Sequence, residues 1–136
     1  MTPKKTRILL ACVHSAYHRV FAILSGYELV YVATLPDAQS ALKADGFNLI
    51  MIGTYFDQSK HLELIRYIKA DVKYANVPIV CFRGNVLPGA KFDFDRKYFE
   101  LHCKATGATE FFDLMQFADD AAGNAAVRRR IADLLE

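Results

Sequence analysis

The sequence predicts an α/β fold in which helices cover both faces of a parallel β-sheet. Three observations support this prediction. Apolar runs alternate with stretches of helical periodicity along a chain of 136 residues, which suits one domain (residues 1–136) with one core. The runs are continuously apolar, as in strands that are covered on both faces. There are five strand signals, and successive parallel strands are joined by right-handed crossovers by default.

The first half of the chain contains three strand signals and two helix signals. Residues 8–13 are an unbroken apolar run, and Ser15 is expected to cap a helix that ends before Gly26. Residues 28–33 are β-branched and aromatic, as in a strand. Pro36 then opens a second helix, which closes before a third strand at residues 47–52.

The second half continues the alternation. Residues 61–69 predict a helix, residues 77–82 a fourth strand with a proline at its start, and residues 107–112 a short fifth strand. Asn124 is expected to cap a last helix, whose apolar residues recur at the helical period.

Composition excludes several classes of protein. Apolar residues make up 53% of the chain, which is too many for a disordered protein. With 17 basic and 15 acidic residues the net charge is +2, so no nucleic-acid partner is expected. The three cysteines lack CxxC spacing, and no apolar stretch is long enough to span a membrane. These features predict a cytoplasmic protein with no membrane partner.

Three segments resemble a known family. The sequence GFNLI at residues 46–50 leads into the third strand, VPIV at residues 77–80 into the fourth, and GATEF at residues 107–111 into the fifth. Together they resemble the response-regulator receiver domain family over residues 7–135. The resemblance implies a flavodoxin-like three-layer sandwich with strand order 2-1-3-4-5, and a site beyond the carboxyl ends of strands 1 and 3.

The site that the resemblance implies lacks every functional residue of the family. Aligned on those segments, the acid pair that holds magnesium becomes Cys12 and Val13, and the phosphoacceptor aspartate becomes Gly53. The hydroxyl position becomes Arg83, and the lysine position becomes Leu114. Magnesium requires oxygen ligands, so neither magnesium nor any other cofactor is expected here. The chain is interpreted as a degenerate receiver, or pseudo-receiver, that cannot be phosphorylated.

Three charged residues lie near this degenerate pocket. If the fourth and fifth strands are neighbours, Arg83 and Asp113 end side by side. They either form an ion pair that fills the pocket or point into water, where they contribute little. Asp57 lies in the loop before the third helix, and a displaced phosphoacceptor there is disfavoured because no acid pair or lysine would serve it.

Histidines offer the strongest hint of a metal site. His14 and His18 are four residues apart on one predicted helix, and Cys12 is close in sequence. No acidic partner accompanies them, so no metal site and no catalytic residue are predicted. His61 and His102 have no motif around them and are expected at the surface.

The link at residues 84–106 is long and rich in aromatic residues. It is expected to form a helix that packs inward on Phe94, Tyr98 and Leu101, or else to expose some rings to a partner. In receivers the face formed by the fourth helix, fifth strand and fifth helix is a docking surface. By this resemblance the candidate interface consists of Tyr98, Phe99, Phe111, Arg128 and Arg129.

The basic run at residues 128–130 has two interpretations. It is a solvated helix face, or it forms an ion-pair rim with Asp119 or Asp120 in a homodimer.

The predicted function is a signalling module without enzymatic activity that works through protein–protein contacts, as a homodimer. The alternative is a small-ligand or metal-binding protein, or an enzyme, with Cys12, His14, His18 and Arg83 lining the crevice at the strand ends. A transcription regulator is less favoured, because no helix-turn-helix follows the receiver-like unit.

Overall fold

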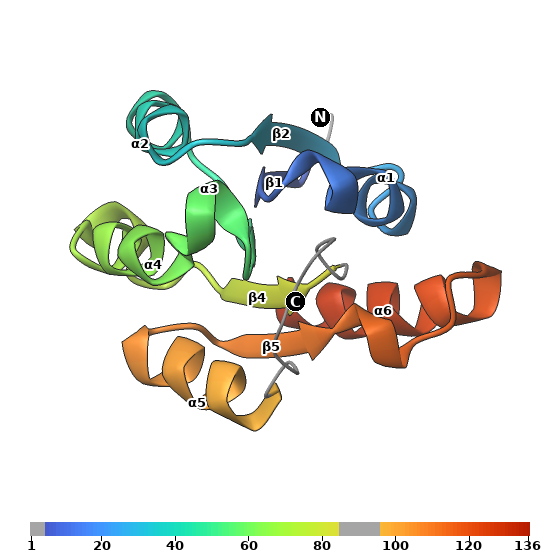
Figure 1. Ribbon diagram of the computed structural model, residues 1–136. Coiled ribbons are helices and arrows are strands. Elements are labelled where there is room, and N and C mark those ends of the chain that lie inside the picture. Colours follow the sequence, from blue (N-terminus) through green and yellow to red (C-terminus); the bar gives the residue numbers. More distant parts are fainter. Residues whose placement is uncertain (1–4, 85–95) are drawn as a thin grey trace.

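The computed structural model describes residues 5–84 and 96–136, and it confirms the predicted architecture. Five parallel strands form one sheet in the order β2-β1-β3-β4-β5 (Figure 1). The strands are β1 (Arg7–Ala11), β2 (Glu28–Val32), β3 (Leu49–Gly53), β4 (Ile79–Arg83) and β5 (Glu110–Asp113).

Helices cover both faces of the sheet, as Figure 1 shows. One face carries α1 (His14–Ile23) and α6 (Ala121–Leu134), and the other carries α2 (Leu35–Ala44), α4 (His61–Lys69) and α5 (Arg96–Thr106). The short elements α3 (Phe56–Ser59), η1 (Val72–Tyr74) and η2 (Leu114–Gln116) complete the order. Within residues 5–84 and 96–136, no helix is long and apolar enough to cross a bilayer.

Alternate residues of each strand belong to two separate cores. Ile52 and Cys81 face α2, α4 and α5, whereas Met51 and Phe82 face α1 and α6. Because side chains alternate along a strand, residue 53 points toward the same side as Met51 and Phe82. This alternation decides what surrounds the candidate site.

Two helix starts differ from the sequence expectation. Val13, not Ser15, is the N-cap of α1, and Ser15 falls inside its first turn. The last helix begins at Ala121, where Asp120 Oδ1 accepts a hydrogen bond from the backbone N–H of Gly123 at 2.8 Å. Asn124 instead accepts one from Arg19 Nε at 3.2 Å. Both helices begin before the predicted cap: Asp120 supplies a side-chain cap at α6, whereas Val13 occupies the N-cap position of α1 without a side-chain hydrogen bond.

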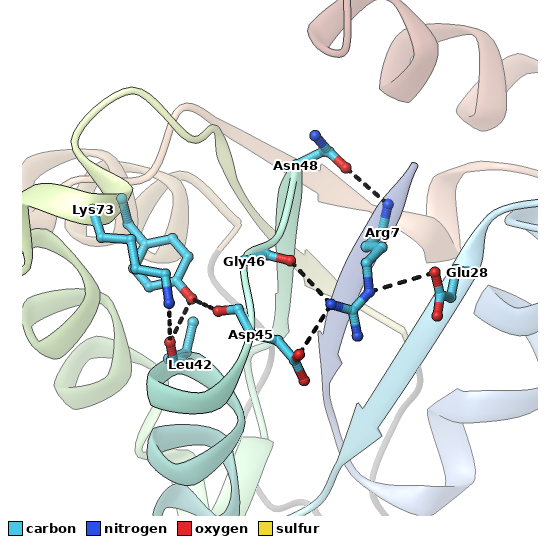
Figure 2. Close-up of polar contacts among 8 residues, drawn as sticks. Arg7, Glu28, Leu42, Asp45, Gly46, Asn48 and Lys73 are labelled. Carbon is cyan, nitrogen blue, oxygen red and sulfur yellow. Dashed lines mark hydrogen bonds and ion pairs between the residues drawn. The ribbon is translucent and has the colours of Figure 1, made fainter. Parts of the chain in front are cut away.

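A polar network lies at the amino ends of the strands, opposite the candidate site. Figure 2 shows Arg7 between Glu28 and Asp45, with its Nε 3.4 Å from Glu28 Oε2 and its Nη1 3.2 Å from Asp45 Oδ1. The backbone N–H of Arg7 donates to Asn48 Oδ1 at 2.9 Å. Arg7 therefore links β1 to β2 and to the segment that leads into β3.

Tyr74 anchors η1 to the end of α2 in the same region. Its buried hydroxyl lies 2.6 Å from the carbonyl oxygens of both Leu42 and Asp45, and Lys73 Nζ donates to the Leu42 carbonyl at 3.2 Å (Figure 2). Carbonyls that α2 leaves unpaired at its C-terminus are satisfied in this way.

Candidate functional site

The strand ends bring the predicted pocket residues to one edge of the sheet. The registers pair Ala11 with Ile52, Gly53 with Phe82, and Arg83 with Asp113. Cys12 follows β1 directly, and Leu114 follows β5. The degenerate positions inferred from sequence therefore lie along one edge of the sheet, as expected from the strand order.

The ring of Phe82 occupies the space beside Gly53. A Cβ added at Gly53 lies 3.5 Å from Phe82 Cζ and 3.1 Å from Cys12 Cβ. Both neighbours are fully buried. A side chain at position 53 would therefore start against two buried apolar groups, with a tight approach to Cys12 Cβ and ordinary van der Waals contact with the Phe82 ring.

Gly84 places a second constraint on the same ring. A Cβ there would lie 2.9 Å from Ala16 Cβ and 3.1 Å from Phe82 Cε2. Glycines at positions 53 and 84 thus allow Phe82 to pack between β3 and α1. Sequence reasoning missed Phe82, although its register opposite Gly53 follows from aligning the two strand ends.

Two further buried residues line this edge. Burial raises the pKa of the Cys12 thiol from 9.0 to about 12, so this sulfur stays protonated. Thr54 is 1% exposed, and its Oγ1 has no hydrogen-bond partner among the residues described. Its backbone N–H donates to the carbonyl of Phe82 at 2.9 Å, which extends the pairing of β3 with β4.

Arg83 and Asp113 lie within salt-bridge distance. Arg83 Nη1 is 3.4 Å from Asp113 Oδ2, and the two side chains are 17% and 5% exposed. Asp113 Oδ1 also accepts from the backbone N–H of Met115 at 3.1 Å, which caps η2. The carboxylate that comes nearest to the strand ends is therefore held by a cation and an amide.

Leu114 stands where the resemblance places a lysine, and its side chain is fully buried. Its carbonyl accepts from Arg19 Nη1 at 2.7 Å, and Arg19 Nη2 donates to the carbonyl of Phe117 at 2.8 Å. Arg19 thus ties α1 to the chain after β5. Sequence reasoning missed this residue, which has no motif around it.

Asp57 has a structural role in the loop after β3. Its Oδ2 accepts from the backbone N–H of Leu35 at 2.7 Å, at the start of α2, and lies 3.8 Å from Lys60 Nζ. Asp57, Gln58 and Ser59 all have positive φ, at 42°, 58° and 64°. Three non-glycine residues in the left-handed region store strain next to the candidate site.

The histidines that suggested a metal site are exposed on α1. The rings of His14 and His18 lie 5.6 Å apart at an angle of 74°, whereas Cys12 is buried below them. Among the described residues, no group of three or more His, Cys, Asp or Glu side chains is placed to hold a metal ion.

Magnesium is the ion that this fold implies, and the residues present do not fit it. Magnesium requires oxygen ligands in octahedral geometry. Cys12 offers a buried protonated thiol, Val13 offers no donor side chain, and the Asp113 carboxylate is already held by Arg83 and Met115.

The structure corrects several surface assignments. Phe111 is 6% exposed and belongs to the core, because it faces α4 and α5 from β5. His61 is also buried, at 6% exposed, and its ring lies 6.0 Å from that of Phe99. Of the two alternatives for this helix, inward packing is wrong for Tyr98 and Leu101, which are 55% and 68% exposed, because Cys103 is the α5 residue that enters the core.

Phe94 lies outside the described residues. Phe99 is half-buried, where an interface position was expected.

The basic run on α6 is divided by its contacts. Arg128 Nη1 donates to the carbonyl oxygens of Ile23 and Ser25, at the end of α1, and its guanidinium lies over the ring of Tyr27. Arg129 is exposed.

The neighbouring charges also have partners within the chain. Arg130 lies over the ring of Phe112 and 3.8 Å from Glu110. Asp119 pairs with Arg19 at 3.5 Å, and Asp120 caps α6. Asp119 and Asp120, the residues proposed for an ion-pair rim in a homodimer, therefore both have partners within the chain.

Comparison with solved structures gives a consistent result. The chain is similar to an orphan response regulator of H. pylori, with TM-score 0.69 and 16% identity over 98% of this chain and 100% of that one. It is also similar to a putative response regulator of Chloroflexus aurantiacus, with TM-score 0.75 and 12% identity over 97% of this chain and 98% of that one.

A third similar structure is the receiver domain of a sensor histidine kinase of Pseudomonas aeruginosa, with TM-score 0.71 and 21% identity over 97% of this chain and 98% of that one. That receiver holds a magnesium ion in its active-site cleft. The chain therefore has the fold of response-regulator receiver domains. No family model matches it, and no curated protein sequence matches it significantly.

Proposed function

We propose that this chain is a receiver-like signalling module that accepts no phosphate and acts through contacts with other proteins. The observation that carries the proposal is a glycine at the end of β3, where a Cβ would stand 3.1 Å from Cys12 Cβ and 3.5 Å from the Phe82 ring. Phosphoryl transfer requires a nucleophile, a metal ion and a counter-charge. Here a glycine, a protonated thiol and a leucine stand in those places.

Loss of the phosphorylation site implies a module with one conformation. A ligand shifts a conformational equilibrium only by its differential affinity for the two states. With Arg83 and Asp113 already paired at 3.4 Å, the charges beside the pocket have partners without any added phosphate. The module then signals by its presence and its surface rather than by a switch. It is proposed to be cytoplasmic, without enzymatic activity, and to bind neither magnesium nor nucleic acid.

The proposed contact surface is the face formed by α5, β5 and α6. It exposes Tyr98 and Leu101 on α5, and Arg129 on α6. Large apolar side chains with more than half of their surface in water are typical of protein-binding sites when they cluster. A second copy of this chain is the proposed occupant, giving a homodimer.

Acetyl phosphate tests the first part of the proposal. The purified chain is incubated with acetyl phosphate and magnesium, and its intact mass is measured beside a receiver that retains its acceptor aspartate. We expect the control protein to gain a phosphoryl group and this chain to keep its mass. A stoichiometric phosphoryl adduct on this chain overturns the proposal. If that adduct is absent in Asp57→Asn, the acceptor is Asp57.

Sedimentation equilibrium tests the homodimer. We expect association at micromolar concentration that Tyr98→Ser with Leu101→Ser abolishes. Phe21→Ser is the matched control, because Phe21 is 52% exposed and belongs to α1, which is not one of the three elements of the proposed face. A monomer at all concentrations, or equal loss in the control, contradicts the dimer.

The rival function is a ligand or metal site that uses Cys12, His14, His18 and Arg83. Burial of Cys12 and the pairing of Arg83 with Asp113 remove two of the four polar groups from the crevice. Metal analysis of the purified protein, with His14→Ala as control, tests the rival directly. Stoichiometric metal that the variant loses would favour it.

A further inference from the structure

Two cysteines and a histidine form a polar cluster inside an otherwise apolar core. Cys81 on β4 and Cys103 on α5 are both 0% exposed, and they belong to the core beneath α4 and α5. Their side chains are hydrogen-bonded to each other, although 22 positions separate them in the chain. This contact brings two sulfurs from different elements together.

His61, the first residue of α4, completes the cluster. Its ring hydrogen-bonds Cys103, and its Nδ1 has no hydrogen-bond partner within the described part of the chain. The residue is 94% buried, since only 6% of its surface is exposed. A buried nitrogen without a partner costs free energy, and packing alone does not explain why a histidine occupies this position.

The contacts polarise the two thiols in opposite directions. Hydrogen bonds from Cys81 and His61, with the nearby His102, lower the pKa of Cys103. The hydrogen bond to Cys103 and burial raise the pKa of Cys81. The two neighbouring thiols therefore differ in acidity, in the direction expected of a nucleophilic cysteine beside a resolving one.

A metal ion explains the cluster less well. Soft ions such as zinc use three or four Cys and His ligands. Across residues 5–84 and 96–136 no such group of three is placed to hold an ion, although the two cysteines and His61 are neighbours.

We propose that Cys81 and Cys103 are a peroxide-sensitive pair that oxidises to a disulfide joining β4 to α5. The Cys103 thiolate attacks one oxygen of the hydroperoxide, so that an S–O bond forms, the O–O bond breaks and the other oxygen leaves as water after taking up a proton. Cys81 sulfur then displaces the hydroxyl group of the sulfenic acid. The thiol proton of Cys81 leaves with that hydroxide as a second water, and His61 Nδ1 relays the proton.

Burial restricts the oxidant to a small molecule. Neither sulfur is exposed, so hydrogen peroxide is expected to react in the folded protein, whereas oxidised glutathione is not. Cys12 is an internal control, because it is equally buried but its pKa is raised to about 12.

The test maps disulfides in the native chain. Protein treated with hydrogen peroxide at pH 7 is denatured, alkylated and digested without reduction. We expect a mass lower by two hydrogen atoms, one cross-linked peptide pair containing Cys81 and Cys103, and alkylation of Cys12 only. An unchanged mass, or a disulfide that includes Cys12, overturns the proposal. Equal reaction with oxidised glutathione also overturns it, because it indicates reaction of unfolded protein.

Variants separate the roles of the three residues. Cys81→Ala is expected to stop at a sulfenic acid on Cys103 that dimedone traps, and Cys103→Ala is expected not to react. His61→Phe keeps the ring beside Phe99 and is expected to slow oxidation by roughly tenfold or more. An unchanged rate in His61→Phe removes the histidine from the mechanism. The mapping of the unmodified chain does not depend on whether these variants fold.

Discussion

An acidic residue introduced at position 53 tests whether buried apolar groups fill the space at the end of β3. In Gly53→Asp the new Cβ lies 3.1 Å from Cys12 Cβ and 3.5 Å from Phe82 Cζ, and both neighbours are fully buried. The carboxyl group would enter an apolar site instead of a hydrated one. We therefore expect the variant to lose stability and still to take up no phosphoryl group from acetyl phosphate.

The expected loss follows from the charge and the space. Keeping a carboxyl of ordinary pKa 3.9 protonated at pH 7 costs about 4 kcal/mol, since each pKa unit corresponds to about 1.4 kcal/mol. Overpacking adds about 1 kcal/mol or more. The sum, about 5 kcal/mol, is a large part of the total stability of a typical domain. Gly53→Asn carries nearly the same atoms without the charge, so it isolates the electrostatic part.

Urea unfolding followed by circular dichroism measures the difference. The introduced carboxyl has a folded pKa above its unfolded value, so its penalty is absent below about pH 4 and grows as the pH rises. We expect Gly53→Asp to be about 4 kcal/mol less stable than Gly53→Asn at pH 7, and less than about 1 kcal/mol less stable at pH 4. Equal stability of the two variants at pH 7 would refute the filled pocket, because it would mean that the carboxylate reaches water or a cation.

Three further predictions concern other parts of the chain. Burial raises the folded pKa of Cys12 from 9.0 to about 12, so the contribution of this thiol to stability is complete below pH 9 and is lost as the pH rises toward 12. Between pH 8 and pH 10, the free energy of unfolding of Cys12→Ala should therefore fall by about 1 kcal/mol less than that of the unmodified chain, as measured by urea unfolding. Tyr74→Phe removes the buried hydroxyl at the end of α2 and should cost about 1 to 2 kcal/mol; an unchanged urea midpoint would show that solvent replaces it. Gln58 has a φ of 58°, which glycine adopts without strain, so Gln58→Gly should raise the midpoint of thermal unfolding. Gln39→Gly inside α2 is the control and should lower that midpoint. A lowered midpoint in both variants would contradict backbone strain at Gln58.

Much of the fold could be predicted because it follows from local patterns. Continuous apolar runs located the five strands, and the helix expected at residues 61–69 is α4 (His61–Lys69). The strand order came from the family resemblance, and the structure confirms it. Helix starts were harder, because several nearby residues can cap a helix and the sequence does not say which one does so. This explains the wrong prediction of Ser15 at α1 and of Asn124 at α6.

For the candidate site, the sequence predicted which residues stand at the strand ends but not which side chains surround them. Missing acids and a missing lysine can be read from aligned positions. The Phe82 ring against Gly53, and the link from Arg19 to the carbonyl of Leu114, depend on side chains that meet across different elements. His61 and Phe111 were placed wrongly at the surface for the same reason, since neighbouring residues do not reveal which helix covers a side chain.

By itself, the sequence predicted a parallel α/β domain whose strand ends carry Cys12, Gly53 and Leu114 where the receiver resemblance implies oxygen ligands and a lysine. Apolar periodicity and residue identity suffice for these statements, because each depends on one position or one segment. Only the tertiary structure decided what surrounds those strand ends, namely the buried ring of Phe82 and the pairing of Arg83 with Asp113, and which two thiols lie together beneath α5. These arrangements join residues far apart in the chain, and packing in three dimensions alone brings them into contact.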